Sequence, residues 1–157
     1  MKASTTSHNN HYLNRFEQVI SLALAKHPRS LAARIDLHLP NEASRNDKNV
    51  ISRFTDAVKA KVKADRKRSK KTNPKAHDSE VHYIWVKESN QIGNKVHYHV
   101  LLMFNKDAYW TLGNYIAKGN LADLIVQAWC SALGVDKEKY RSLVYFKKIT
   151  CYHINRN

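Results

Sequence analysis

The stretch VKESNQIGNKVHYHVLLMFN, residues 86–105, decides how this chain folds because it joins a strong strand signal to a turn signal. Its second half, VHYHVLLMF, and the segment EVHYIWVKE that overlaps its start are both rich in β-branched and aromatic residues. The polar loop SNQIGNK separates these two segments. Together they predict an antiparallel β-hairpin.

His97 and His99 add a chemical signal, because residues two apart on a strand point to the same side. If Glu88 pairs with His97, then Val86 lies opposite His99, and one carboxylate and two imidazoles share a face. Such a set suits a divalent metal, which can polarise a phosphate oxygen through its open positions. A slip of one residue would send Glu88 to the other face. The alternative is one histidine in the core and one on the surface.

On the N-terminal side of the hairpin, the pattern predicts a helix, a strand and a second helix. The first helix lies within residues 12–28 and stops before Pro28, and its apolar face is Leu13, Phe16, Ile20 and Leu24. Within residues 30–40, the stretch RIDLHL, residues 34–39, alternates between polar and apolar residues and predicts a strand with one polar face. The second helix covers about residues 46–68, and its buried stripe is Val50, Phe54, Val58 and Val62.

On the C-terminal side, Asn120 can cap a helix that stops at Gly134, and residues 141–152 indicate a last strand at a sheet edge. The element order is therefore αβαββαβ. This order predicts an α+β fold with a single antiparallel sheet and helices packed on it. We expect a flexible N-terminus over residues 1–11 and one domain over residues 12–157.

The formal net charge of +14 favours a polyanion as partner. The basic residues concentrate in KAKVKADRKRSKKTNPK, toward the end of the second helix, where they can follow a phosphate backbone without reading sequence. The candidate DNA-binding residues in this run are Lys63, Arg66, Lys67, Arg68, Lys70 and Lys71. The alternative is a solvated charged helix end.

Neither a membrane nor an oxidising compartment is indicated by the sequence. The chain has no apolar run long enough to cross a bilayer, and no basic segment has the bulky apolar face of a membrane-surface helix. Cys130 and Cys151 are too few and too far apart for a disulfide framework or a CxxC metal site. We therefore expect a cytoplasmic protein without a membrane partner; the sequence does not give its oligomeric state.

Three separated blocks carry a family resemblance: FEQVISLALAKHPRSLAARIDLHLP, VKESNQIGNKVHYHVLLMFNKDAYWTLGNY and LADLIVQAWCSALG. In this order they resemble the YagK/YfjJ C-terminal-domain family, over nearly all of residues 12–157. That family is found in prophages and satellites and is related to the gene-two replication initiators of filamentous phages. The His-hydrophobe-His strand also resembles the metal site of the HUH endonucleases, which nick single-stranded DNA.

The resemblance implies an HUH/Rep-like architecture, also described as ferredoxin-like or RRM-like, and a divalent metal, Mg²⁺ or Mn²⁺. His97 and His99 would be paired ligands of that metal and Glu88 the third. The strand RIDLHL matches the first motif strand of the superfamily, so Arg34, Asp36 and His38 are candidates for DNA contact or for orienting a ligand imidazole. An ordinary polar outer face of the strand is the equal alternative.

An HUH enzyme also needs a nucleophilic tyrosine, often in a Tyr-x-x-Lys pattern on a helix after the histidine strand. YIAK, residues 115–118, is the match here, which makes Tyr115 the candidate catalytic residue. In the resembling family we would expect the nucleophile helix to follow YFKKITCYHINRN, where this chain ends. Three interpretations stay open: a truncated chain, a protein that lost the helix, or Tyr115 in an unusual position.

Two functions follow from the sequence. The first is a replication-initiator domain that binds single-stranded or origin DNA and a metal for site-specific nicking and strand transfer. The second is a catalytically incomplete DNA-binding module that interferes with, or regulates, replication of a mobile element. A retained metal site favours the first, and a missing nucleophile favours the second.

Overall fold

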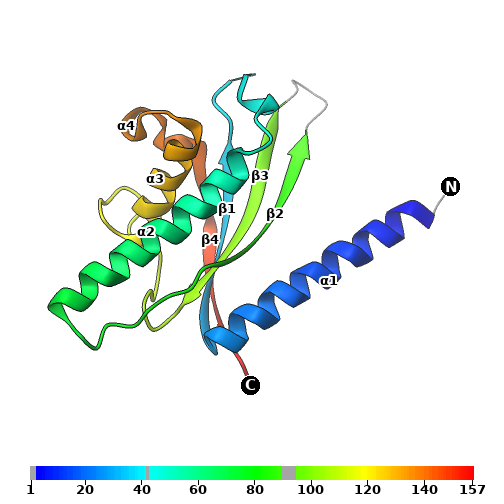
Figure 1. The fold of residues 1–157 in the computed structure, drawn as a ribbon. Helices are drawn as coiled ribbons and strands as arrows, with labels where there is room; N and C mark the ends of the chain where they lie inside the picture. The colour runs from blue at the N-terminus through cyan, green and yellow to red at the C-terminus, as the bar shows by residue number, and fades with distance from the viewer. Residues whose placement is uncertain (1–2, 42, 90–94) are drawn as a thin grey trace.

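The computed structural model describes residues 3–41, 43–89 and 95–157. A four-stranded antiparallel sheet has the strand order β2-β3-β1-β4 (Figure 1). The elements are α1 (Ala3–Lys26), β1 (Arg29–His38), a 3₁₀ turn (Ala43–Asn46), α2 (Val50–Thr72), β2 (His82–Ser89), β3 (Val96–Asn105), α3 (Leu121–Leu133), α4 (Lys137–Tyr140), a 3₁₀ turn (Arg141–Leu143) and β4 (Val144–Asn155). The α+β prediction and the edge position of the last strand are confirmed.

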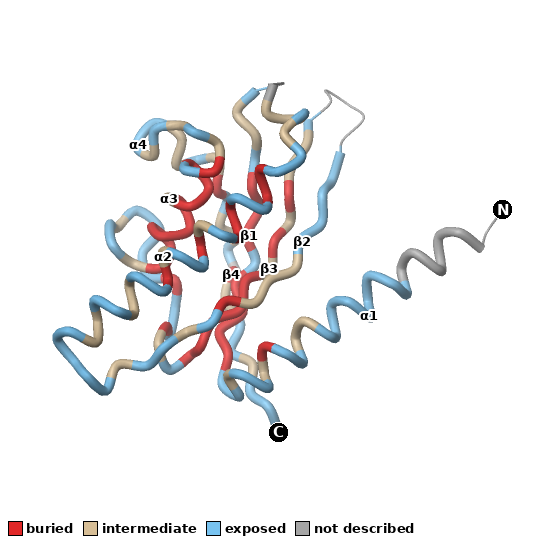
Figure 2. Tube along the Cα trace, in the orientation of Figure 1, coloured by how far each residue is buried: buried red, intermediate tan, exposed pale blue. Residues whose placement is uncertain are grey.

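Helices α2 and α3 cover one face of the sheet, and most of the buried residues lie between them and the strands (Figures 1 and 2). The predicted stripe of α2 is buried as expected: Val50, Phe54, Val58 and Val62. Trp129 of α3 is fully buried and packs edge-on against Phe54, with ring centroids 5.6 Å apart. Its indole Nε1 donates a hydrogen bond of 2.9 Å to the carbonyl oxygen of His38, which ties α3 to the end of β1.

Both predicted ends of α3 are confirmed. The Asn120 side chain accepts a hydrogen bond of 2.9 Å from the backbone N–H of Asp123, and Gly134 ends the helix with a φ of 71°. Asp123 is buried and accepts hydrogen bonds from Arg141, at 2.8 Å, and from the backbone N–H of Gly119, at 2.9 Å. These contacts hold the loop before α3 in place.

Helix α1 differs from its prediction at both its start and its apolar face. The helix begins at Ala3, so regular structure covers most of the N-terminal segment that we expected to be loose over residues 1–11. It meets the sheet near its C-terminal end, where Ile20 and Ala23 pack with Met103 (Figure 1). Leu13 and Phe16 are exposed, because the helix diverges from the sheet toward its N-terminus.

Helix α2 begins later than predicted, at Val50, because the residues before it form the 3₁₀ turn Ala43–Asn46. The turn of the β2–β3 hairpin, residues 90–94, lies outside the described residues. Of the helices in the described ranges, none is both long enough and apolar enough to cross a membrane.

Candidate metal centre

Of the two registers considered, the hairpin has the one that places Glu88 on the face of the two histidines, with Glu88 opposite His97 and Val86 opposite His99. One ligand atom from each of Glu88, His97 and His99 lies within 4.8 Å of the others. His97 Nε2 is 3.2 Å from Glu88 Oε2, and His99 Nε2 contacts the same oxygen. The imidazoles and the carboxylate therefore converge on one point on the sheet face that α2 and α3 leave open.

Strand β1 adds a second carboxylate to this cluster, because it pairs with β3 and places Asp36 opposite His99. Asp36 Oδ1 lies 2.6 Å from His99 Nδ1, and Lys147 Nζ of β4 lies 3.6 Å from Asp36 Oδ2. Asp36 is buried, unlike an ordinary polar residue of an outer face. Asp36 therefore contacts the imidazole of a candidate ligand, and its predicted roles, orienting that imidazole or contacting DNA, stay predictions.

His38 also faces this cluster. Its ring stacks on that of His97, with centroids 5.3 Å apart and an angle of 15° between the planes. Burial lowers the pKa of His38, and the neighbouring His97 lowers it further. A neutral imidazole therefore lies against a candidate ligand and adds no positive charge that would repel a cation.

Glu88 and His99 shift each other's pKa. The hydrogen bond to His99 holds the pKa of the Glu88 carboxyl below its usual range. The same contact raises the pKa of His99, and the hydrogen bond to Asp36 raises it further. Both shifts follow from opposite charges at short range.

The donor set fits a divalent cation. Two imidazole nitrogens and a carboxylate oxygen are ligands of borderline metals, and Asp36 supplies the outer carboxylate that metal-binding histidines usually have. Glu88 has 56% of its side chain exposed, so the cluster is accessible from solvent. A metal held here would keep open positions for a substrate oxygen.

An apolar groove of about 530 Å³ runs from this cluster between α1 and the open sheet face. It is lined by side chains of α1 and all four strands: Tyr12, Leu13, Phe16, Ile20, Ala32, Arg34, Ile84, Trp85, Val86, His99, Leu101, Tyr152 and Ile154. Arg34 gives the groove a cation. The sequence did not indicate this groove, because α1 and β4 are brought to it only by the fold.

Tyr115, the predicted nucleophile, is not brought to the cluster of Glu88, His97 and His99, the candidate metal site, which we call the metal cluster. Its ring stacks on Phe146, with centroids 4.5 Å apart and 7° between the planes. Phe146 of β4 lies opposite Ile35 of β1, whose side chain is in the buried core. Asp36 follows Ile35 in β1 and points to the open face, because successive side chains of a strand alternate between faces. Tyr115 therefore lies on the helix-covered side of the sheet.

Other tyrosines lie on the side of the metal cluster. Tyr145 pairs with Asp36 across β1 and β4, and Tyr152 lines the groove together with His99. Lys147, next to Asp36, is a further residue that the sequence did not single out. No local signal marks these three, because their positions depend on how β4 aligns with β1, a pairing of distant segments with a register shift between Ala33 and Ile35.

The basic run lies along the second half of α2, toward the opposite end of the sheet from the cluster (Figure 1). Lys70 pairs with Asp78 at 2.5 Å, while Arg66 and Arg68 both contact Asp65. Lys63, Lys67 and Lys71 are exposed. The structure thus separates the candidate DNA-binding residues into two groups: Arg34, Asp36 and His38 near the metal cluster, and the α2 residues away from it.

The fold and the site define an α+β domain that carries a carboxylate–dihistidine cluster on the open face of an antiparallel sheet. The chain belongs to the YagK/YfjJ C-terminal domain family, whose family model matches residues 1–157. YagK of Escherichia coli (strain K12) is 33% identical over 169 residues, covering 100% of this chain and 81% of YagK. YfjJ of the same organism is 38% identical over 162 residues, covering 96% of this chain and 77% of YfjJ. No solved structure matches.

Proposed function

We propose that this chain is an HUH-type replication-initiator domain of a phage, prophage or satellite. It binds single-stranded DNA and a divalent metal, Mg²⁺ or Mn²⁺, and nicks and rejoins the strand at a specific site. The observation that carries the proposal is the convergence of Glu88, His97 and His99 within 4.8 Å on the open sheet face. The net charge of +14 supports a nucleic acid as substrate.

In this proposal some side chains of the cluster bind the metal, and a neighbouring side chain orients a ligand imidazole. Glu88, His97 and His99 would hold the metal, which supplies Lewis-acid polarisation of the scissile phosphate. Asp36 accepts a hydrogen bond from His99 Nδ1, which leaves the lone pair of Nε2 free to act as a ligand. Lys147 Nζ lies 3.6 Å from Asp36 Oδ2 and forms an ion pair with this carboxylate.

The groove beside the cluster suits an unpaired strand. Its apolar and aromatic walls offer flat surfaces to bases, and base–aromatic stacking contributes about 1–3 kcal/mol per base. Arg34 can contact a phosphate at the same place. A strand in this groove would pass directly beside His99.

The proposed chemistry is attack of a tyrosine oxygen on a backbone phosphorus. The phenol loses its proton, the oxygen–phosphorus bond forms, the bond to the 3′ oxygen breaks, and that oxygen takes up a proton. Strand transfer is the reverse step with another 3′-hydroxyl. Tyr12, Tyr145 and Tyr152 lie on the face where the phosphate would be held, and Tyr115 does not.

The test is the formation of a denaturation-resistant protein–DNA adduct with Mn²⁺ and an end-labelled single strand carrying the origin region of the element. We expect His97→Ala to abolish the adduct and Tyr115→Phe to retain it. Tyr12→Phe, Tyr145→Phe and Tyr152→Phe identify the nucleophile among the tyrosines of the open face. An adduct that His97→Ala leaves intact would contradict the proposal.

A second function is favoured by one observation, the position of Tyr115 on the covered side of the sheet. If no adduct forms while metal and single-stranded DNA still bind, the chain acts as a catalytically incomplete DNA-binding module. Such a module would regulate, or interfere with, replication of a mobile element by occupying origin DNA. Competition with an active initiator for a labelled origin strand would measure that activity.

A further inference from the structure

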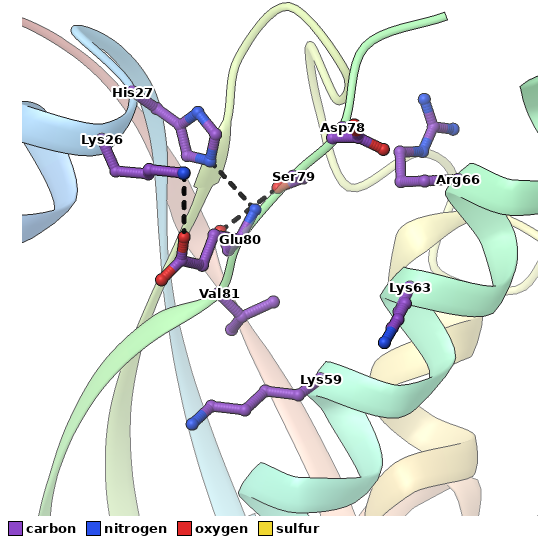
Figure 3. Close-up of a pocket in the computed structure, with 9 residues that line it drawn as sticks. All are labelled: Lys26, His27, Lys59, Lys63, Arg66, Asp78, Ser79, Glu80 and Val81. Atoms are coloured by element: carbon purple, nitrogen blue, oxygen red, sulfur yellow. Dashed lines mark hydrogen bonds and ion pairs between the residues drawn. The ribbon is translucent and has the colours of Figure 1, made fainter.

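A second cavity lies near the start of β2, whereas Glu88 of the metal cluster lies near the end of this strand. Its volume is about 540 Å³, and it opens between α2, the C-terminal end of α1 and the segment that leads into β2 (Figure 3). Nine residues line it: Lys26, His27, Lys59, Lys63, Arg66, Asp78, Ser79, Glu80 and Val81. We call it the basic pocket.

Four cationic side chains and two carboxylates line the basic pocket, so the net charge of its lining is positive. Lys59, Lys63 and Arg66 follow the spacing of one helix face and come from the same side of α2 (Figure 3). The two carboxylates already have partners, since Glu80 pairs with Lys26 at 3.6 Å and Asp78 pairs with a lysine outside the pocket at 2.5 Å.

Within the described residues, neither Lys59 nor Lys63 has a carboxylate partner. Lys59 Nζ lies 5.0 Å from the centroid of the Tyr83 ring, a contact that leaves its charge uncompensated. The pocket therefore holds two ammonium groups that an anion can engage without breaking an ion pair.

The walls of the pocket are held before any ligand arrives. Arg66 is 14% exposed, donates to Asp65 at 3.0 Å and stacks on Tyr109 at 4.5 Å, so its positive charge is fixed. His27 Nε2 accepts a hydrogen bond of 2.9 Å from the backbone N–H of Glu80, which anchors the opposite wall. A ligand would thus have to order only the two lysine side chains.

The chemistry of the lining indicates a phosphate group as ligand. Of the nine lining residues, Val81 alone has an aliphatic hydrocarbon side chain and four are cations, so the pocket suits an anionic group better than a base or a lipid chain. Lysine is a common phosphate ligand, and its ammonium group binds without requiring a planar partner. Between Val81 and Glu88, seven steps along the strand span roughly 23 Å. A single strand several nucleotides long can therefore reach both places.

We propose that the basic pocket is a phosphate-binding site, and that it holds a backbone phosphate of the strand whose scissile phosphate lies at the metal cluster. The assignment of that phosphate to DNA rests on the proposed function, whereas the affinity of the pocket for phosphate does not. The pocket would fix the direction and reach of the strand without reading its sequence.

The first test uses inorganic phosphate, so that it does not depend on DNA binding. The pocket variant is Lys59→Ala with Lys63→Ala, and the matched control is Lys48→Ala with Lys148→Ala, two exposed lysines outside the pocket. We expect phosphate to raise the Tm of the wild type and of the control above its value in chloride at equal ionic strength. The pocket variant should lose this rise. An equal rise in all three proteins overturns the proposal.

The second test measures the binding of single strands of about 4 and about 16 nucleotides, the range of site sizes of single-strand-binding domains. The pocket variant should lose at least tenfold more affinity than the control for the longer strand, and no more than the control for the shorter one. The slope of its log affinity against log salt should become shallower by about 0.7 for each phosphate that the pocket no longer neutralises. Equal losses for the longer strand overturn the strand path, even when phosphate binds.

The two tests separate the pocket from the proposed function. A wild type that binds phosphate but no single strand contradicts the proposed function and the DNA assignment, and leaves a site for a free phosphate or a small phosphate ester. A wild type that binds single strands with no contribution from the pocket lysines contradicts the pocket alone. Circular dichroism of both double variants checks that the fold is unchanged.

Discussion

The two faces of the four-stranded sheet differ in how they are covered and in what they carry. One face is closed by α2 and α3 over a continuous apolar core that includes the fully buried Trp129. On the other face, the small cluster of Ala23, Ala32 and Met103 is the buried apolar contact with α1, and the rest is groove and metal cluster. The continuous apolar core and the candidate metal site therefore lie on opposite sides of the same strands.

The largest expected effect tests the covered face. Trp129→Ala should lower the free energy of unfolding by about 3–5 kcal/mol, because it leaves a cavity in the core and removes the hydrogen bond to His38. On the open face, Tyr152→Ala should cost only about 1 kcal/mol, since 47% of Tyr152 is exposed. Urea denaturation followed by circular dichroism measures both, and equal losses would contradict the comparison.

The next effect concerns the buried carboxylate that anchors the loop before α3. Burial alone would raise the pKa of Asp123, but the hydrogen bonds from Arg141 and the backbone of Gly119 outweigh it, and the pKa lies well below its usual range. Because the folded pKa is depressed, the stabilisation is present above the unfolded pKa of about 3.9 and is lost as the pH falls below it.

Asp123→Asn should therefore cost about 1.5–3 kcal/mol at pH 7, and the difference from the wild type should shrink toward pH 3. Unfolding by urea at pH 7, 4 and 3 gives this difference directly. A difference that stays constant from pH 7 to pH 3 would show that the charge of Asp123 does not contribute. The exposed carboxylate Asp56, changed to Asn, is the control.

A smaller effect concerns Asp36, the carboxylate that contacts His99 on the open face. Asp36→Asn should weaken Mn²⁺ binding by about 10–100-fold, because His99 loses the carboxylate that orients its ring. Isothermal titration with Mn²⁺ measures the affinity, and Glu138→Gln, which removes a carboxylate far from the cluster, should leave it unchanged. If Asp36→Asn binds Mn²⁺ as the wild type does, Asp36 does not position the ligand.

The smallest effect tests whether the two faces are chemically separate. Tyr115→Phe should change the free energy of unfolding by no more than about 0.5 kcal/mol, because its ring stacking on Phe146 is retained. It should also leave Mn²⁺ affinity and single-strand binding as they are. A loss of Mn²⁺ affinity would show that Tyr115 is energetically coupled to the candidate metal site on the opposite face.

The parts of the site that the sequence predicted are those that local periodicity controls. Glu88, His97 and His99 lie on one hairpin, so the two-residue period and a short connection set which side chains share a face. The stripe of α2 and both ends of α3 follow from spacing and capping in the same way. The start of α1 was placed too late, because its polar first turns carry no apolar period.

The parts that the sequence did not predict depend on distant segments. For Asp36 the sequence leaves two equal alternatives, because its contact with His99 depends on the pairing of β1 with β3 and joins residues 63 apart in the chain. Tyr115 matches a short sequence motif, but its ring stacks on Phe146, which places it on the covered side of the sheet. The basic pocket joins the end of α1, the middle of α2 and the start of β2.

The sequence by itself determined the α+β class and the shared face of His97 and His99, and it predicted the hairpin register in which Glu88 joins them. Only the tertiary structure decided which residues of β1 and β4 stand beside them, which tyrosines face the cluster, and where the cations of α2 meet a pocket. The physical reason is that a strand or helix period acts between near neighbours in the chain. The pairing of remote strands depends instead on loop closure and on the packing of the whole core.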